Sequence, residues 1–178
     1  MSSRSTISAD YLAQQQELHK NPKYGIASLS YAPLVKQVMM QFGVKSLSDY
    51  GAGKCALRNG LYELGMKDFA YFPYDPAFPQ YGDPQPADLV CCIDVLEHIE
   101  PEYLDIVLRD LKAITHKHGF FSIYMGPAEK YLADGRNAHL IQQPSSWWLP
   151  KLCESFEILH LQGSPGGFWV LVSPRKTS

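Results

Sequence analysis

Short apolar segments alternate with longer segments of helical periodicity from about residue 30 onward. In one helical segment Leu104, Val107, Leu108 and Leu111 recur at spacings of three and four, whereas residues 88–93 form a nearly continuous apolar run. Chains that alternate strands with helices form parallel sheets covered by helices. The pattern therefore predicts a three-layer, doubly wound α/β fold whose mostly parallel sheet ends in an antiparallel C-terminal strand.

The boundaries of these elements follow from capping residues and from helix-breaking Gly and Pro. We expect Asp10 and Ser145 to cap their helices, with Pro150 in a first turn. The Pro- and Gly-rich stretch 76–86 is predicted as a loop that could contain a degenerate third strand or helix. The predicted helices are 10–20, 33–42, 56–64, 101–114 and 145–153, and the predicted strands are 45–50, 69–74, 88–93, 119–125, 157–161 and 168–173.

The chain length favours a single domain over residues 1–178. With 178 residues and 46% hydrophobic content, it can bury one sizeable core and is too short for two ordinary domains. We assign residues 44–178 to the core sheet and its helices. The helical segment 1–32 is rich in polar and aromatic residues, which suggests a lid over a bound ligand, with plain packing against the sheet edge as the alternative.

Composition and charge exclude several function classes. The formal net charge of -2 provides no strong field for DNA, RNA or anionic lipid, so nucleic-acid binding is not favoured. No apolar run approaches the roughly 18 residues that cross a membrane, and the polar start lacks a signal peptide, so we expect a soluble, cytoplasmic protein. The four cysteines show neither a disulfide framework nor zinc-ligand spacing, and we predict no metal site.

A glycine turn between a predicted strand and a predicted helix is the first candidate site. It contains Asp49, Gly51 and Gly53, and glycine lets the backbone approach a ligand while the helix N-terminus offers free N–H groups. Cys55 stands where a phosphate-binding loop needs Ser or Thr, so ATP or GTP hydrolysis is disfavoured. A turn without any ligand is the alternative.

Polar residues also follow the next two strands along the chain. Tyr74 and Asp75 end one strand, and a carboxylate there can accept hydrogen bonds from ribose hydroxyls. Asp94, Glu97 and His98 follow the most apolar strand, at the sheet edge where open α/β folds bind ligands. Together with the glycine turn, these positions indicate a nucleoside-bearing cofactor.

The ordered motifs Asp-x-Gly-x-Gly, Tyr-Asp-Pro and Asp-Val-Leu-Glu-His resemble those of the class I (Rossmann-like) S-adenosylmethionine-dependent methyltransferases, over roughly residues 44 to 125. The resemblance implies S-adenosyl-L-methionine as cofactor. The residues that it implies at the cofactor are Asp49, Gly51 and Gly53 at the methionine moiety, Tyr74 and Asp75 at the ribose, and Asp94 and Val95 at the sulfonium. Cys55 departs from the third glycine common in the family, and only Asp83 is a candidate for the acid on the adenine side.

Candidates for catalysis and substrate binding surround the same strand ends. His139 and, second to it, His98 are candidate general bases, although His98 could instead only satisfy backbone groups. Glu97, Arg136 and Asn137 are candidate substrate-binding residues, and for Arg136 a solvated surface charge is the alternative.

The sequence as a whole predicts methyl transfer to an O or N atom of a small molecule, such as a metabolite, sugar or nucleotide. A non-catalytic module that binds the methyl donor or its demethylated product, or a partner subunit, is the main alternative. A nicotinamide-dependent oxidoreductase shares the glycine turn and the ribose acid but not the motif at Asp94–His98. The acceptor atom and the oligomeric state are left open.

Overall fold

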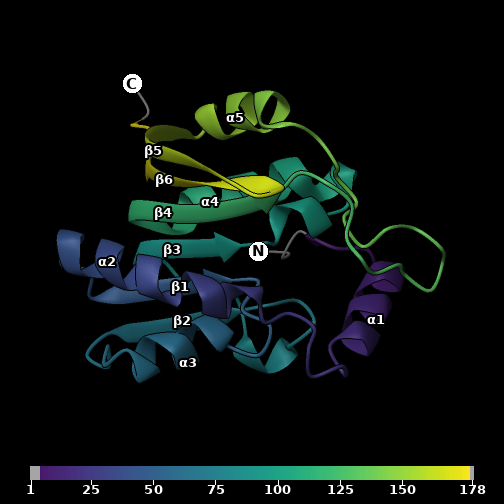
Figure 1. Cartoon of the computed structure of the whole chain (residues 1–178), viewed down its shortest axis with the longest axis horizontal. Coiled ribbons are helices and arrows are strands. Elements are labelled where there is room, and N and C mark those ends of the chain that lie inside the picture. Colours follow the sequence, from purple (N-terminus) through teal and green to yellow (C-terminus); the bar gives the residue numbers. More distant parts are fainter. Residues whose placement is uncertain (1–4, 177–178) are drawn as a thin grey trace.

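The computed structural model describes residues 5–176, which form a six-stranded sheet with helices on both faces (Figure 1). The strand order is β2-β1-β3-β4-β6-β5. The first four strands pair in parallel, and β6 pairs antiparallel with both β4 and β5. This arrangement confirms the predicted doubly wound sheet with an antiparallel C-terminal end.

The helices and strands are closely similar to those predicted. The α-helices are α1 (Ala9–Leu18), α2 (Ala32–Phe42), α3 (Ala56–Glu63), α4 (Leu104–Ile114) and α5 (Ser145–Cys153). The strands are β1 (Ser46–Tyr50), β2 (Ala70–Tyr74), β3 (Ala87–Ile93), β4 (Thr115–Tyr124), β5 (Phe156–Ser164) and β6 (Gly167–Pro174). Short 3-10 turns lie at Ala27–Tyr31, Pro79–Tyr81, Leu96–His98 and Pro101–Tyr103.

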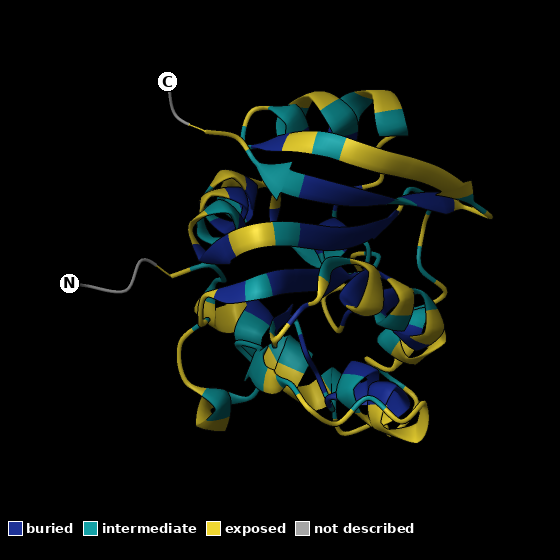
Figure 2. Cartoon of the chain, turned by 90° about the vertical axis from the view of Figure 1, so that its left-hand side faces the viewer, coloured by how far each residue is buried: buried dark blue, intermediate teal, exposed yellow. Residues whose placement is uncertain are grey.

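The central strand β3 supplies two hydrophobic cores because successive side chains point to opposite faces of a sheet. Val90 and Cys92 pack on the side of α4 and α5, whereas Leu89 and Cys91 pack on the side of α2 and α3. Figure 2 shows the middle of the sheet buried and the outer helix faces exposed. Cys91 and Cys92 are thus buried core thiols.

Two predicted helix caps are wrong. Ser8, not Asp10, caps α1: its backbone is extended and its Oγ accepts the N–H of Tyr11 at 3.2 Å. Ser145 makes no capping hydrogen bond, because Pro144 is the cap residue and Ser145 is already helical. Pro150 lies inside α5, beyond the first turn in which the sequence analysis placed it.

Two other predicted boundaries also move. Strand β4 begins at Thr115, directly after α4, so residues 115–118 extend the predicted strand 119–125 toward the helix. The stretch 76–86 contains the short turn Pro79–Tyr81 and no strand, so the described sheet has no strand beyond β2 on that side. Four prolines in this stretch remove the backbone donors that a strand needs.

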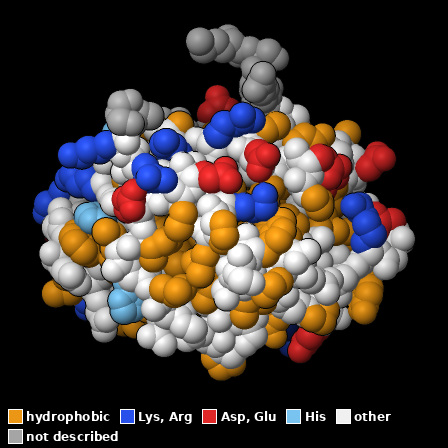
Figure 3. Space-filling model, turned by 90° about the horizontal axis from the view of Figure 1, so that it is seen from above, with side chains coloured by type: hydrophobic (Ala, Val, Ile, Leu, Met, Phe, Trp, Pro, Cys, Tyr) orange, Lys and Arg blue, Asp and Glu red, His pale blue; other side chains and the backbone are white. Residues whose placement is uncertain are grey.

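The face that carries α5 and the β5 edge mixes charges of both signs. Acidic and basic side chains lie intermixed there, beside a group of apolar side chains (Figure 3). On the edge strand, Leu159 and Leu161 are exposed. Across residues 5–176, none of the helices combines the length and the apolarity that crossing a bilayer requires.

The packing of Leu89 generates a test of the fold. Its side chain is fully buried between β1, β4 and the α2–α3 layer, so we expect Leu89→Ala to lower the free energy of unfolding by about 2–5 kcal/mol. Leu159→Ala removes the same atoms from a half-exposed position on the edge strand, and it should change the free energy of unfolding by less than about 0.5 kcal/mol. Urea unfolding followed by circular dichroism measures both, and equal losses would contradict this description of the core.

Candidate functional site

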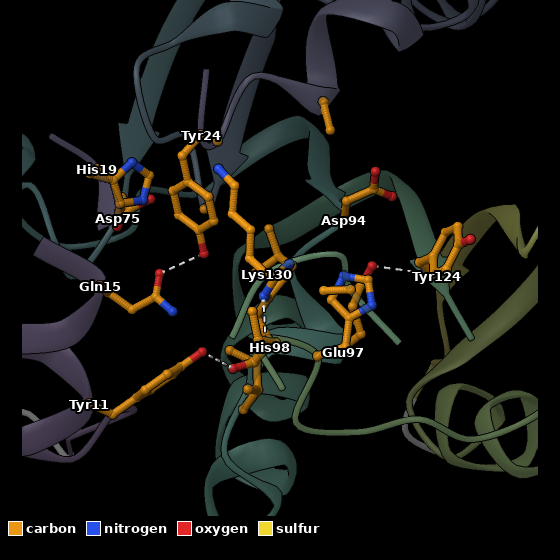
Figure 4. Close-up of a pocket in the computed structure, with 18 of the residues that line it drawn as sticks. Tyr11, Gln15, His19, Tyr24, Asp75, Asp94, Glu97, His98, Tyr124 and Lys130 are labelled. Carbon is orange, nitrogen blue, oxygen red and sulfur yellow. Dashed lines mark hydrogen bonds between the residues drawn. The ribbon is translucent and has the colours of Figure 1, made fainter. Parts of the chain in front are cut away.

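A pocket of about 590 Å³ lies at the carboxyl ends of β1, β2 and β3. Its walls come from these strand ends, from α1 and the segment after it, and from the loop after β4, and their side chains face one another in Figure 4. The volume is in the range of small-molecule and cofactor sites. Of the predicted site residues, the pocket is lined by Gly51, Asp75, Asp94, Val95, Glu97, His98 and His139.

The glycine turn after β1 requires its glycines. Gly51 has a φ of 80°, and a Cβ there would lie 2.3 Å from Cγ2 of Val95. Gly53 has a φ of 49° and packs against the carbonyl oxygen of Gly25. Cys55 adopts a left-handed φ of 56°, which favours glycine and which the buried cysteine tolerates here. The glycine turn is therefore closely packed against Val95 and against the segment that contains Gly25.

The N–H groups of this turn bind within the protein. Those of Gly51 and Ala52 donate to the carbonyl oxygen of Tyr74 at 2.7 and 2.9 Å, and that of Gly53 donates to Oδ2 of Asp75 at 2.9 Å. The sequence predicts free N–H groups for an anion at the N-terminus of the following helix. The N–H groups of Gly51, Ala52 and Gly53 in the turn itself are not available to an anion, because they are already used within the protein.

Asp75 joins the pocket to the glycine turn. Its Oδ2 accepts the Gly53 N–H, and its Oδ1 accepts the N–H of Ala77 at 2.8 Å. Each carboxylate oxygen keeps a second lone pair for a ligand. Burial raises the pKa of Asp75 above its usual value, because desolvation disfavours the charge.

Asp49 and Tyr74 lie behind the pocket wall. Asp49 is buried in the sheet and accepts a hydrogen bond from the hydroxyl of Tyr71, and burial raises its pKa to about 7. The ring of Tyr74 packs on Tyr50, with centroids 4.7 Å apart. Neither side chain lines the cavity, and Gly53 also lies just outside it.

Asp94 turns the chain sharply at the end of β3. It has a φ of 52°, a conformation that Asp tolerates better than most residues. Its N–H donates to Ser122 Oγ at 3.0 Å, and its Oδ1 accepts the Ser122 hydroxyl at 2.6 Å. This pairing with β4 directs the following turn, Leu96–His98, into the pocket.

Glu97 is a fully buried carboxyl group in that turn. Its Oε1 accepts the N–H of Tyr124 at 2.9 Å, whereas its Oε2 has no hydrogen-bond partner among the described residues. Burial, and then the charge of Asp94, raise the pKa of Glu97 to about 8.

The two predicted histidines lie together. Their ring centroids are 4.7 Å apart, and each Nδ1 lies 2.8 Å from a backbone carbonyl oxygen, that of Ala138 for His98 and that of Gly126 for His139. A carbonyl can only accept, so both Nδ1 atoms carry a proton, and in the neutral form of either ring the lone pair is on Nε2. Burial lowers the pKa of His98 to about 4, which keeps its ring neutral.

Arg136 and Asn137 do not reach the pocket. Arg136 is exposed and pairs with Asp134 at 2.7 Å. Asn137 holds the loop after β4 closed, because its side-chain oxygen accepts the N–H groups of Ala128 and His139, both at 2.9 Å. Asn137 thus positions His139 from outside the cavity.

The segment from α1 to Gly25 covers the pocket. The Tyr11 hydroxyl donates to the carbonyl oxygen of His98 at 2.7 Å, and that of Tyr24 donates to Gln15 at 3.0 Å. His19 packs edge-on against Tyr24, and burial lowers its pKa to about 4. Within the described chain, Gln15 Nε2 and His19 Nδ1 are buried without a partner, so both can meet a ligand.

Tyr124 and Lys130 line the pocket although no motif marks them. Tyr124 ends β4, and its place at the carboxyl end of a parallel strand is the signal by which it could have been found. Lys130 lies in an irregular loop with its ammonium 4.8 Å from the ring centroid of Tyr24, a contact that no local pattern indicates.

Solved structures resemble the whole chain. The 1,6-didemethyltoxoflavin-N1-methyltransferase of Burkholderia thailandensis, crystallised with 1,6-didemethyltoxoflavin and S-adenosylhomocysteine, matches 99% of this chain and 94% of its own with TM-score 0.63 and 16% identity. The N-methyltransferase NodS of Bradyrhizobium japonicum, in complex with S-adenosylhomocysteine, matches 95% of this chain and 100% of its own, with TM-score 0.55 and 11% identity. An rRNA methylase of Escherichia coli matches 95% of this chain and 78% of its own, with TM-score 0.54 and 15% identity.

The fold is that of the class I methyltransferases. No protein-family model and no curated protein matches the sequence. At these identities the likeness concerns the arrangement of the chain. In this class I methyltransferase fold, the three motifs noted in the sequence follow β1, β2 and β3, whose carboxyl ends border one pocket.

The buried carboxyl of Asp49 generates a pH-dependent prediction. Its pKa in the fold, about 7, exceeds the ordinary value of 3.8, so the folded state holds an extra proton between these values and stability falls as pH rises through that interval. Asp49→Asn cannot titrate and still accepts the Tyr71 hydroxyl. We expect the stability of the variant relative to the native protein to rise by about 1–4 kcal/mol between these pH values.

Urea unfolding of the ligand-free protein at several pH values measures this difference. Asp68→Asn, an exposed carboxyl before β2, is the matched control and should leave the pH dependence unchanged. Parallel curves for the native protein and Asp49→Asn would refute the assignment.

Proposed function

We propose that the chain transfers a methyl group from S-adenosyl-L-methionine to an oxygen or nitrogen atom of a small molecule. The observation that carries the proposal is the pocket beside the glycine turn, in which Gly51, Asp75 and Asp94 face one cavity. The class I methyltransferase fold supports it, as does the bound S-adenosylhomocysteine of two structural neighbours.

The residues of the pocket fit a cationic nucleoside better than a dinucleotide. Among the described lining residues, five carboxyl groups (Asp75, Asp94, Glu97, Glu100, Glu129) accompany two lysines (Lys23, Lys130). The raised pKa of Glu97, about 8, keeps this group protonated near neutral pH, but the other four carboxyl groups still outnumber the lysines. A sulfonium is attracted by such an environment, whereas the pyrophosphate of a nicotinamide cofactor is repelled. The glycine turn also lacks free N–H groups for a pyrophosphate. Both observations disfavour the oxidoreductase alternative.

Each wall residue has a role in this proposal. Gly51, which packs against Val95 and lines the pocket, would lie beside the methionine part of the cofactor, and Asp75 would accept the ribose hydroxyls with its remaining lone pairs. Asp94 borders the sulfonium. The buried Gln15 Nε2 and His19 Nδ1 supply further hydrogen bonds from above. The cofactor, when bound, supplies an electrophilic methyl group.

The acceptor occupies the other end of the pocket, by Glu97, His98, His139 and Tyr124. The protein places it in line with the methyl group and excludes water, which suffices for displacement at a sulfonium. A base is needed only where the acceptor atom holds a proton of high pKa. His98 and His139 both line this space with Nδ1 held by a carbonyl, so a proton would be received at Nε2. His139 is the better candidate, because the lowered pKa of His98, about 4, makes its ring a weak base.

In this proposal the segment 1–32 serves as the lid. The contacts that support this role come from residues 5–32, the part of the segment that the structure describes. Ser8 binds Glu100 with its N–H at 2.8 Å and its hydroxyl at 2.7 Å, and Lys54 binds the carbonyl oxygens of Asn21 and Tyr24. These contacts hold the segment over the glycine turn. A covered pocket favours a small acceptor over an RNA, although one neighbour is an rRNA methylase.

Calorimetry tests the cofactor and the role of Asp75 together. We expect S-adenosylmethionine and S-adenosylhomocysteine to bind in the micromolar range and NAD not to bind. Asp75→Ala should weaken binding of both sulfur nucleosides by at least about tenfold, because it removes charge-assisted hydrogen bonds. Asp68→Ala, an exposed carboxyl before β2 that does not line the pocket, is the matched control. Thermal unfolding of each variant monitors folding.

Binding of NAD alone, or of no nucleoside, would overturn the proposal. Turnover with a panel of small hydroxyl and amine compounds then separates an enzyme from a binding module. A protein that binds the methyl donor and methylates no acceptor in the panel would favour the non-catalytic alternative.

A further inference from the structure

Three metal-ligating side chains meet at the acceptor end of the pocket. Glu97 and His98 come from the turn after β3, and His139 comes from the loop after β4. One potential ligand atom from each lies within 4.8 Å of the others. We propose that Glu97, His98 and His139 bind one divalent transition-metal cation. This inference goes beyond methyl transfer and does not depend on it.

Both imidazoles have the arrangement typical of metal ligands. A ligating histidine usually donates its other ring N–H to a carbonyl or carboxylate, which fixes the tautomer and aims the lone pair. His98 does so toward Ala138 and His139 toward Gly126, each at 2.8 Å. The two carbonyls belong to the same loop, so its closed conformation orients both rings.

Glu97 supplies the anionic ligand. Its side chain is fully buried, and Oε1 is held by the N–H of Tyr124. Its Oε2 is buried and, among residues 5–176, has no hydrogen-bond partner. A buried carboxylate oxygen without a partner is costly, and a cation satisfies it directly.

Neighbouring contacts keep the three side chains near one another. The N–H of Ile141 donates to the Glu97 carbonyl oxygen at 3.0 Å, and Asn137 accepts the His139 N–H at 2.9 Å. Ligand atoms of a tetrahedral zinc site lie about 3.4 Å apart, given bonds of about 2.1 Å. Side-chain rotations that close the triad by about 1 Å therefore complete the site.

The donor set selects the class of cation. Two imidazoles and one carboxylate suit Zn²⁺, Fe²⁺, Co²⁺ and Mn²⁺, whereas Mg²⁺ and Ca²⁺ prefer oxygen ligands throughout. Three protein ligands leave at least one coordination position open, as in catalytic sites. Because all three residues line the pocket, a ligand in the pocket can reach that position.

A metal here changes the roles predicted from the sequence. A histidine whose Nε2 holds a cation cannot accept a proton at the same atom, so His98 and His139 become ligands in place of general bases. The cysteine spacing alone led to the expectation of no metal site. His139 reaches the other two ligands only through the fold.

Metal binding tests the proposal without any activity measurement. The untagged full chain, treated with a chelator, is titrated with Co²⁺ and with Zn²⁺ by absorption spectroscopy and calorimetry. We expect one cation per chain, with a visible Co²⁺ spectrum that Zn²⁺ abolishes. Loss of an outer partner alone weakens metal sites by about 10- to 100-fold, so Glu97→Gln and His139→Gln should each weaken binding by at least about 100-fold.

Two variants and a control keep the test decisive. Glu97→Gln preserves the acceptor for the Tyr124 N–H, and His139→Gln changes a half-buried loop residue, so the second remains informative if the first fails to fold. His116→Gln, an exposed histidine in β4, should bind as the native protein does. Absence of a one-to-one complex, or equal affinity in native protein and a folded triad variant, would overturn the metal site.

The outcome is separable from that of the proposed function. Binding of S-adenosylmethionine is measured with the chelator-treated protein, and cation binding is measured without the nucleoside. A protein that binds the cation but no sulfur nucleoside would support the metal site and contradict the methyltransferase assignment. A protein that binds the sulfur nucleosides but no cation would support the methyltransferase assignment and contradict the metal site.

Discussion

The parallel pairing of β1 with both β2 and β3 is the constraint on which the pocket depends. This pairing brings the carboxyl ends of the three strands to one edge of the sheet. Asp49 of β1 lies opposite Pro73 of β2 on one side and opposite Cys91 of β3 on the other. Polar residues at those ends would be far apart in an extended chain. Once the register is set, Gly51, Asp75 and Asp94 face one cavity.

The same register explains why the glycine turn is closed to anions. The carbonyl of Tyr74, the last residue of β2, accepts two N–H groups of the turn, and Asp75 accepts a third. A turn held in this way contacts a ligand through van der Waals packing and through Asp75. The strand pairing that forms the pocket thus also leaves Gly51, Ala52 and Gly53 without free N–H groups for a phosphate.

Most of the fold could be predicted from the sequence, because the helices and strands bury periodic apolar faces. The errors lie where side-chain geometry decides, as at the cap of α1, where Ser8 also binds the distant Glu100. In the site, local motifs indicated Gly51 and Asp75, which lie next to their strands. They misplaced Arg136, whose charge is paired with Asp134, and they missed Lys130, which reaches the pocket from an irregular loop. Contacts that depend on loop conformation leave no periodic signal.

His98 connects the cover of the pocket with its acceptor end. Its backbone carbonyl accepts the Tyr11 hydroxyl of α1, while its ring nitrogen binds the loop that holds His139. A displacement of α1 therefore acts on the turn Leu96–His98, and a change at the histidine pair acts on the docking of α1. The position of α1 and the arrangement of Glu97, His98 and His139 are thus linked through one short turn.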